Sequence, residues 1–123
     1  MDLKPLRREQ LNFENGLHAQ RLLPWANLNA PFEGSWCVIA PGTASTAHAH
    51  HEYEIFIALA GEAWLESEGQ RQPFRAGDIV HFTPGTPHAV VNEGTEPFEM
   101  YSVWWDLAMA ECFMTRHTLR SGG

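Results

Sequence analysis

Three histidines, His48, His50 and His51, stand within four positions of one another, and a glutamate, Glu54, follows them. On an extended strand, His48 and His50 would point to the same face, with their Cα atoms roughly 6.5 Å apart. That spacing allows both imidazoles to reach one ion at about 2.0–2.1 Å. His51 would point the other way, toward solvent or a subunit contact. The pair therefore predicts part of a metal site, against the simpler alternative of a polar surface loop.

Glu54 could complete this site only under one condition. Four extended residues would carry it roughly 13 Å from His50, so the chain must turn between residues 51 and 53. The sequence HEY before the apolar IFIALA is compatible with such a turn. Two histidines and one carboxylate form a ligand set for redox and Lewis-acid metals.

The glycines on either side extend this pattern. From Gly42 to Gly61 the sequence reads glycine, five residues, His-x-His, three residues, glutamate, six residues and glycine. This order resembles the first signature motif of the cupin superfamily. The stretch GDIVHFTPGTPHAVVN resembles the second motif, with Gly77, Gly85, His88 and Asn92 at the expected offsets. One departure is Thr83, which stands where the family has proline.

The resemblance implies an all-β fold, a cupin jelly-roll β-barrel. It also implies four metal ligands in this chain, namely His48, His50, Glu54 and His88. The expected cofactor is one divalent ion per chain, with Fe, Mn, Ni and Zn as the alternatives. Asn92 would support the site or serve a structural turn.

The segments between turn signals favour the same architecture. Short runs rich in Val, Ile, Phe, Trp and Thr lie between glycines, prolines and asparagines, which is typical of an all-β sandwich or barrel. The predicted strands are 35–40, 54–60, 62–67, 78–83, 88–92 and 98–105. We expect one domain over residues 1–123, with a core at about 35–106, an N-terminal arm at 1–34 and a tail at 107–123. Asp106 is expected to cap a short C-terminal helix through about residue 119. Within the arm, 17–25 is ambiguous between strand and helix.

Composition restricts the partners. Eight basic residues against fifteen acidic ones give a net charge of −7, which argues against nucleic acid or an anionic membrane as partner. The start has no hydrophobic segment typical of a secretory signal, and no apolar run could span a bilayer. Cys37 and Cys112 could pair, but free thiols are expected without an export signal. These features predict a cytoplasmic protein whose partner is a small molecule, and the family likeness suggests a homodimer.

Further side chains are candidates for chemistry beside the ion. His81 could act as a proton shuttle, although a hydrogen-bonded or exposed histidine is the simpler interpretation. Tyr53 and Tyr101 could donate hydrogen bonds into the cavity or could simply pack. Some of Trp36, Phe56 and Trp104 are expected to form an apolar wall around a ligand.

Three functions follow as hypotheses. The first is a metal-dependent enzyme that performs dioxygenation, isomerisation or rearrangement of a small polar metabolite. The second is a cupin that binds a ligand without turnover. The third rests on MYSVWWD and EIFIALAGEAWL, which resemble cupins associated with nitrogen–nitrogen bond-forming hydrazine synthetases. That likeness implies a synthetase-like protein partner related to methionyl-tRNA synthetase.

Overall fold

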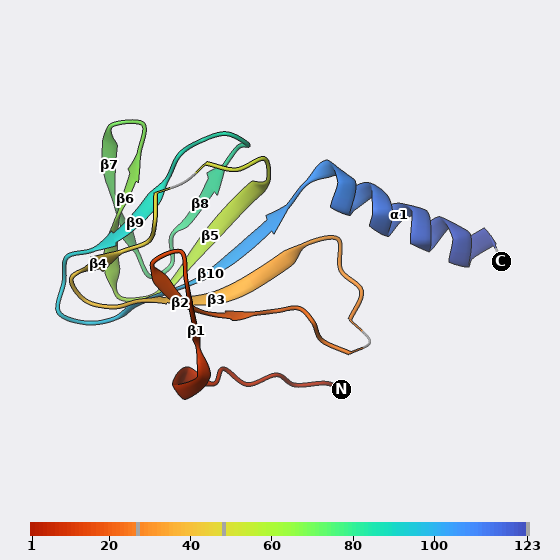
Figure 1. Cartoon of the computed structure of the whole chain (residues 1–123), viewed down its shortest axis with the longest axis horizontal. Helices are drawn as coiled ribbons and strands as arrows, with labels where there is room; N and C mark the ends of the chain where they lie inside the picture. Colours follow the sequence, from red (N-terminus) through yellow and green to blue (C-terminus); the bar gives the residue numbers. More distant parts are fainter. Residues whose placement is uncertain (27, 48, 123) are drawn as a thin grey trace.

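Two antiparallel sheets face one another across an apolar core (Figure 1). The computed structural model describes residues 1–26, 28–47 and 49–122, with side chains up to residue 115. The six-stranded sheet has the order β1-β2-β3-β10-β5-β8, and the four-stranded sheet has the order β4-β9-β6-β7. The strands are β1 (Asn12–Glu14), β2 (Leu17–Arg21), β3 (Glu33–Ile39), β4 (Thr43–Ala44), β5 (Tyr53–Ala60), β6 (Glu62–Ser67), β7 (Gln70–Arg75), β8 (Ile79–Phe82), β9 (Ala89–Asn92) and β10 (Phe98–Trp105). The predicted all-β jelly-roll barrel is confirmed.

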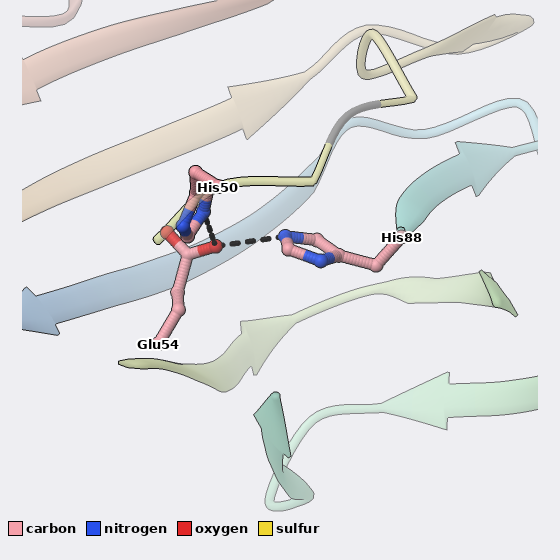
Figure 2. Close-up of side chains that lie close together, drawn as sticks. All are labelled: His50, Glu54 and His88. Atoms are coloured by element: carbon pink, nitrogen blue, oxygen red, sulfur yellow. Dashed lines mark hydrogen bonds and ion pairs between the residues drawn. The ribbon is translucent and has the colours of Figure 1, made fainter. Parts of the chain in front are cut away.

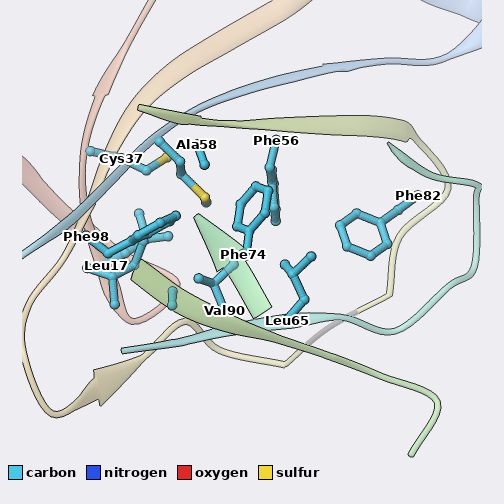
Figure 3. Close-up of a cluster of buried hydrophobic side chains, with 13 residues drawn as sticks. Leu17, Cys37, Phe56, Ala58, Leu65, Phe74, Phe82, Val90 and Phe98 are labelled. Carbon is cyan, nitrogen blue, oxygen red and sulfur yellow. The ribbon is translucent and has the colours of Figure 1, made fainter. Parts of the chain in front are cut away.

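The core forms where inward-facing side chains of both sheets meet. In β10 the buried residues alternate, with Phe98 and Met100 pointing inward. They meet Phe74 and Val90 from the opposite sheet, all at most 1% exposed (Figure 3). Burying a side chain of this size contributes about 1.5–3 kcal/mol, so this cluster holds the two sheets together.

The strand predictions succeeded where the residues are apolar and failed at the edges. β6 and β10 have the predicted bounds, β5 and β9 differ by one residue at the start, and β3 and β8 differ by one or two residues at both ends. β7 was not predicted because its sequence, QRQPFR, is mostly polar and exposed. It is an edge strand, which is where proline is tolerated in a sheet. The ambiguous segment 17–25 contains β2, so part of the N-terminal arm belongs to the larger sheet.

His50 does not lie on a strand, although the common orientation of His48 and His50 was argued from strand geometry. β4 ends at Ala44, and no strand is assigned to the described residues between there and Tyr53. The carbonyl of His50 accepts a hydrogen bond from the Gly85 amide at 2.8 Å, which ties this segment to the loop after β8. The turn expected between residues 51 and 53 is present, because a bend at 51–52 precedes β5.

An α-helix, α1 (Leu107–Gly122), follows β10 and projects away from the barrel (Figure 1). Asp106 caps it as predicted, because its Oδ1 accepts a hydrogen bond from the Met109 amide at 2.7 Å. This bond and a second one from His51 hold the pKa of Asp106 below its ordinary value. No helix in the described part of the chain has the length and apolar character needed to cross a membrane.

The N-terminal arm lies along the outside of β2. Lys4 donates to the carbonyls of Arg21 and Leu22 at 3.1 and 2.9 Å, and the Arg7 amide donates to Gln20 at 2.8 Å. Arg8 forms an ion pair with Glu99 of β10. The arm therefore covers part of the outer face of the six-stranded sheet.

The two cysteines are free thiols, as expected. Cys37 is buried in the barrel and Cys112 is exposed on the helix. Burial raises the pKa of the Cys37 thiol to about 12, so this group stays protonated at neutral pH.

Gly61 lies in the turn between β5 and β6, and Gly69 lies in the turn between β6 and β7. Together they test how tightly the first of these turns packs against the start of β10. Both have positive φ angles, +89° and +79°, which side chains disfavour. A Cβ on Gly61 would also lie 2.8 Å from the Pro97 carbonyl oxygen, whereas one on Gly69 meets nothing within 4 Å. We expect Gly61→Ala to lower the free energy of unfolding by about 1–3 kcal/mol more than Gly69→Ala does, measured by urea denaturation. Equal losses in the two variants would contradict this packing.

Candidate metal centre

Three side chains from separate parts of the chain meet at one carboxylate oxygen (Figure 2). Glu54 extends from β5, His50 from the segment before it, and His88 from the position just before β9. The Oε1 atom of Glu54 lies 3.2 Å from Nε2 of His50 and 2.8 Å from Nε2 of His88. These ligand atoms all lie within 4.8 Å of one another.

The spacing of these atoms suits a bound ion. Ligands about 2.1 Å from a metal, at right angles to each other, stand about 3.0 Å apart. The two distances to Glu54 Oε1, 3.2 and 2.8 Å, bracket that value. One oxygen and two imidazole nitrogens also form a donor set that binds Zn, Fe, Mn or Ni. The three residues could therefore hold a divalent metal ion.

The hydrogen bond made by Nδ1 of His88 determines the tautomer of the ring, and so determines whether Nε2 faces Glu54 with a lone pair. Nδ1 of His88 lies 2.9 Å from the Thr86 carbonyl oxygen, which can only accept, so Nδ1 carries a hydrogen. A neutral His88 then turns the unprotonated Nε2 toward the negative Glu54. That arrangement is stable when a cation stands between them or when the imidazole is protonated. Donation of the other ring N–H to a backbone carbonyl, as Nδ1 does here to Thr86, is usual for a metal-bound histidine.

Glu54 is held ionised in a buried position. Glu54 is 7% exposed, and burial alone would favour the protonated form of its carboxyl group. Contact with Nε2 of His88 and a hydrogen bond from Ser102, whose hydroxyl donates to Oε2 at 2.8 Å, outweigh that effect and hold the pKa of Glu54 below its ordinary value. The site thus presents a buried negative charge that a cation can neutralise.

Aromatic rings fix the orientation of His88. The ring of Phe82 stacks on the imidazole with centroids 4.1 Å apart and an interplanar angle of 10°. Phe56 meets the same imidazole edge-on at 5.5 Å. These apolar neighbours leave His88 3% exposed and lower the local dielectric constant, which strengthens charge interactions at the site.

The cluster opens into a cavity of about 320 Å³ inside the barrel. The apolar part of its wall includes Leu17, Phe56, Met100 and Trp104, and hydroxyls come from Ser35, Ser45 and Ser102. Glu14 and Arg21 line it from β1 and β2, and Glu52 lies 3.6 Å from Nδ1 of His50 through its carboxylate. A small polar molecule could reach the ion site from this cavity.

The structure brings together His50, Glu54 and His88 of the four predicted ligands, while His48 lies outside the described residues. His51 is exposed, as expected, and contacts Asp106 at 2.9 Å. Asn92 has the structural role that was one of its two alternatives. Its amide donates to the carbonyls of Ile39 and Glu96, and its oxygen accepts from the Gly94 amide.

The candidates for chemistry beside the ion, His81 as a proton shuttle and Tyr53 and Tyr101 as hydrogen-bond donors, lie on the opposite side of the sheet. Tyr53 and His81 stand beside Trp105 on its outer face, with Tyr53 centroids 6.1 and 5.8 Å from those of His81 and Trp105. Tyr101 packs edge-on against Trp36, also outside the cavity. The structure therefore does not bring any of the three candidates to the cluster. Of the three aromatic residues from which the apolar wall was expected, Phe56 and Trp104 line the cavity, whereas alternation along β3 turns Cys37 inward and Trp36 outward.

Ser102 was not singled out from the sequence, although a signal was present. In FEMYSVWW the inward positions are Phe98, Met100 and Ser102, so a small hydroxyl stands where apolar residues are expected. Such a polar residue on a buried face needs a partner, which here is Glu54.

Comparison with known proteins gives a consistent match. Residues 35–104 match the family model described as the Cupin domain. A solved structure of a Cupin 2 conserved barrel domain protein from Salinispora arenicola is 58% identical, with a TM-score of 0.92 over 95% of this chain and 98% of that one. A protein from Photorhabdus luminescens is 35% identical, with a TM-score of 0.91 over 96% and 99%.

A curated relative carries a more specific name. The oxalate-binding protein of Thermotoga maritima is 32% identical over 66 residues, which are 53% of this chain and 54% of that protein. The chain spans about half the length of the curated relatives it matches.

Ser102→Ala tests the support of Glu54 directly. Loss of the hydroxyl leaves a buried carboxylate oxygen without its donor, so we expect zinc affinity to fall by about 10- to 100-fold, measured by competition with a chelating dye. Ser35→Ala is the matched control, because Ser35 is equally buried, lines the same cavity and bonds to the Trp36 carbonyl rather than to Glu54. Equal zinc affinities in the two variants would contradict the role of Ser102.

Proposed function

We propose that this chain, which belongs to the cupin family, binds one divalent metal ion and converts a small carboxylate-bearing metabolite at it. The observation that carries the proposal is the buried, ionised Glu54 facing the Nε2 atoms of His50 and His88 at the end of a cavity. A carboxylate placed in this way stabilises a cation that two imidazoles can also bind.

The metal is proposed from the donor set. Fe, Mn, Ni and Zn all accept imidazole and carboxylate ligands, and His48 is the proposed fourth ligand. When bound, such an ion would act as a Lewis acid on an oxygen of the substrate, and Fe or Mn would add redox chemistry.

The chain's own residues would prepare the site for a small ligand. Ser102 keeps Glu54 oriented, and the Thr86 carbonyl orients His88 through Nδ1. Phe56 and Phe82 exclude water from one side of His88. A cavity of about 320 Å³ lies at the small end of ligand pockets, which favours a metabolite of few atoms.

A carboxylate on the substrate is supported by a relative and by the cavity. The Thermotoga relative is named for binding oxalate, which is a small dicarboxylate. The cavity of this chain combines serine hydroxyls with a guanidinium, and both groups donate hydrogen bonds to carboxylate oxygens. Dioxygenation, isomerisation and rearrangement are the proposed reaction classes.

A second candidate is a protein that binds the same kind of ligand without turnover. It is favoured by the positions of Tyr53, His81 and Tyr101, because the proton shuttle and the hydrogen-bond donors considered from the sequence do not line the cavity. NMR spectra of carboxylates incubated with the metal-loaded protein separate the two candidates, because only an enzyme consumes its ligand. The synthetase-like partner stays a prediction.

The metal itself is tested by elemental analysis of protein purified without chelator or nickel resin. We expect about one equivalent of metal per chain in the wild type and a loss of at least tenfold in His88→Ala, because a buried ligand is removed. His81→Ala is the control, since this histidine is exposed on the outer face. Wild-type protein without stoichiometric metal, or equal metal content in the two variants, would contradict the proposal.

A further inference from the structure

The strand register places a basic residue in the cavity wall, on a strand that is not adjacent to the one that carries Glu54. Arg21 of β2 pairs with Ser35 of β3, which pairs with Ser102 of β10, and Ser102 pairs with Phe56 of β5. These four side chains line the cavity in one row across the sheet. With strands about 4.8 Å apart, the row is about 14 Å long between the Cα atoms at its ends. Glu54 lies two residues from Phe56 on β5, so β3 and β10 separate the strand that carries Arg21 from the strand that carries Glu54.

Two neighbours hold the guanidinium of Arg21 at this position. Its Nε and Nη2 atoms donate to Oε1 of Glu14 at 3.3 and 2.9 Å. The guanidinium carbon also lies 5.6 Å from the centre of the Trp104 ring. These contacts use two of the five N–H donors, and the other three have no hydrogen-bond partner among the described residues. Arg21 is therefore held by Glu14 and Trp104, and three of its N–H donors can bind a ligand.

The charges around the cavity give Arg21 a distinct role. It is the only lysine or arginine among the described residues that line the cavity, whereas Glu14, Glu52 and Glu54 are all acidic. These carboxylates repel an anionic group of a ligand, and beside Arg21 the guanidinium opposes the repulsion from Glu14.

We infer that Arg21 binds an anionic group at the end of the substrate remote from the ion, so the substrate carries a metal-binding oxygen at one end and a carboxylate at the other. This inference rests on the proposed function. At about 30 Å³ for each water-sized group, the cavity holds about ten non-hydrogen atoms. The substrate class is thus a short dicarboxylate or a carboxylate with a polar group at its other end.

The test compares glutarate with its monoamide, which has the same size and one charge fewer. Binding to zinc-loaded protein is measured by calorimetry. We expect glutarate to bind about tenfold more tightly than the monoamide in the wild type, because a charge-assisted bond to Arg21 is lost in the amide. Arg21→Met should bring this ratio close to one, and Glu14→Gln should raise the affinity for glutarate because it removes the competing carboxylate.

Arg71→Met is the matched control for this experiment. Arg71 also pairs with a glutamate, Glu93, and lies 4.8 Å from the Trp64 ring, but it is outside the cavity. It should keep the wild-type ratio. A ratio that survives Arg21→Met would overturn the inference, as would a wild-type ratio of one. Metal content is measured on every variant, so a failure of the metal site is seen separately.

Discussion

The arrangement of the barrel interior depends on one buried negative charge. Glu54 lies in a cavity wall where ionisation would be costly, and contact with His88 and a hydrogen bond from Ser102 keep it ionised. Each of these partners comes from a different strand or loop, so the charge is satisfied only in the folded barrel. The apolar core positions these groups, and in return the carboxylate gives His50 and His88 a common partner. Removing one partner would leave a buried charge without compensation, which costs more than the bond itself contributes.

The sequence predicted the fold because alternation and turn residues are local signals. The strands that bury one face, such as β6 and β10, were found with their bounds. β7 was missed because an edge strand can be polar and can contain Pro73 without loss of a ladder bond. The cluster was predicted through its motif spacing rather than through strand geometry. The argument that His50 lies on a strand was wrong, yet the turn before Glu54 made the same convergence possible.

The side chains around the cluster were harder to predict because the sequence of a strand does not show which of its two faces points into the barrel. His81, Tyr53 and Tyr101 were candidates by residue type, and the period of two places all three on the outer face. Ser102 and Arg21 are inward by the same rule. A polar residue within an alternating strand can face the core only if it finds a partner, so partners across the sheet decide its role. Those partners depend on register, which the sequence does not show.

The two faces of the six-stranded sheet therefore differ in chemistry. Inward residues of β5 and β10 contribute to the candidate ion site, and outward residues of the same strands, such as Tyr53 and Trp105, form the exterior of the sheet. A bulge interrupts this pair of strands, since Glu99 and Met100 pair with Ala60 and Ala58 and leave Leu59 without a register partner. A one-residue slip elsewhere in the pair would exchange the faces and move Glu54 into contact with solvent. The partners of Glu54 oppose such a slip, because Ser102 and His88 reach its carboxylate only in the present register.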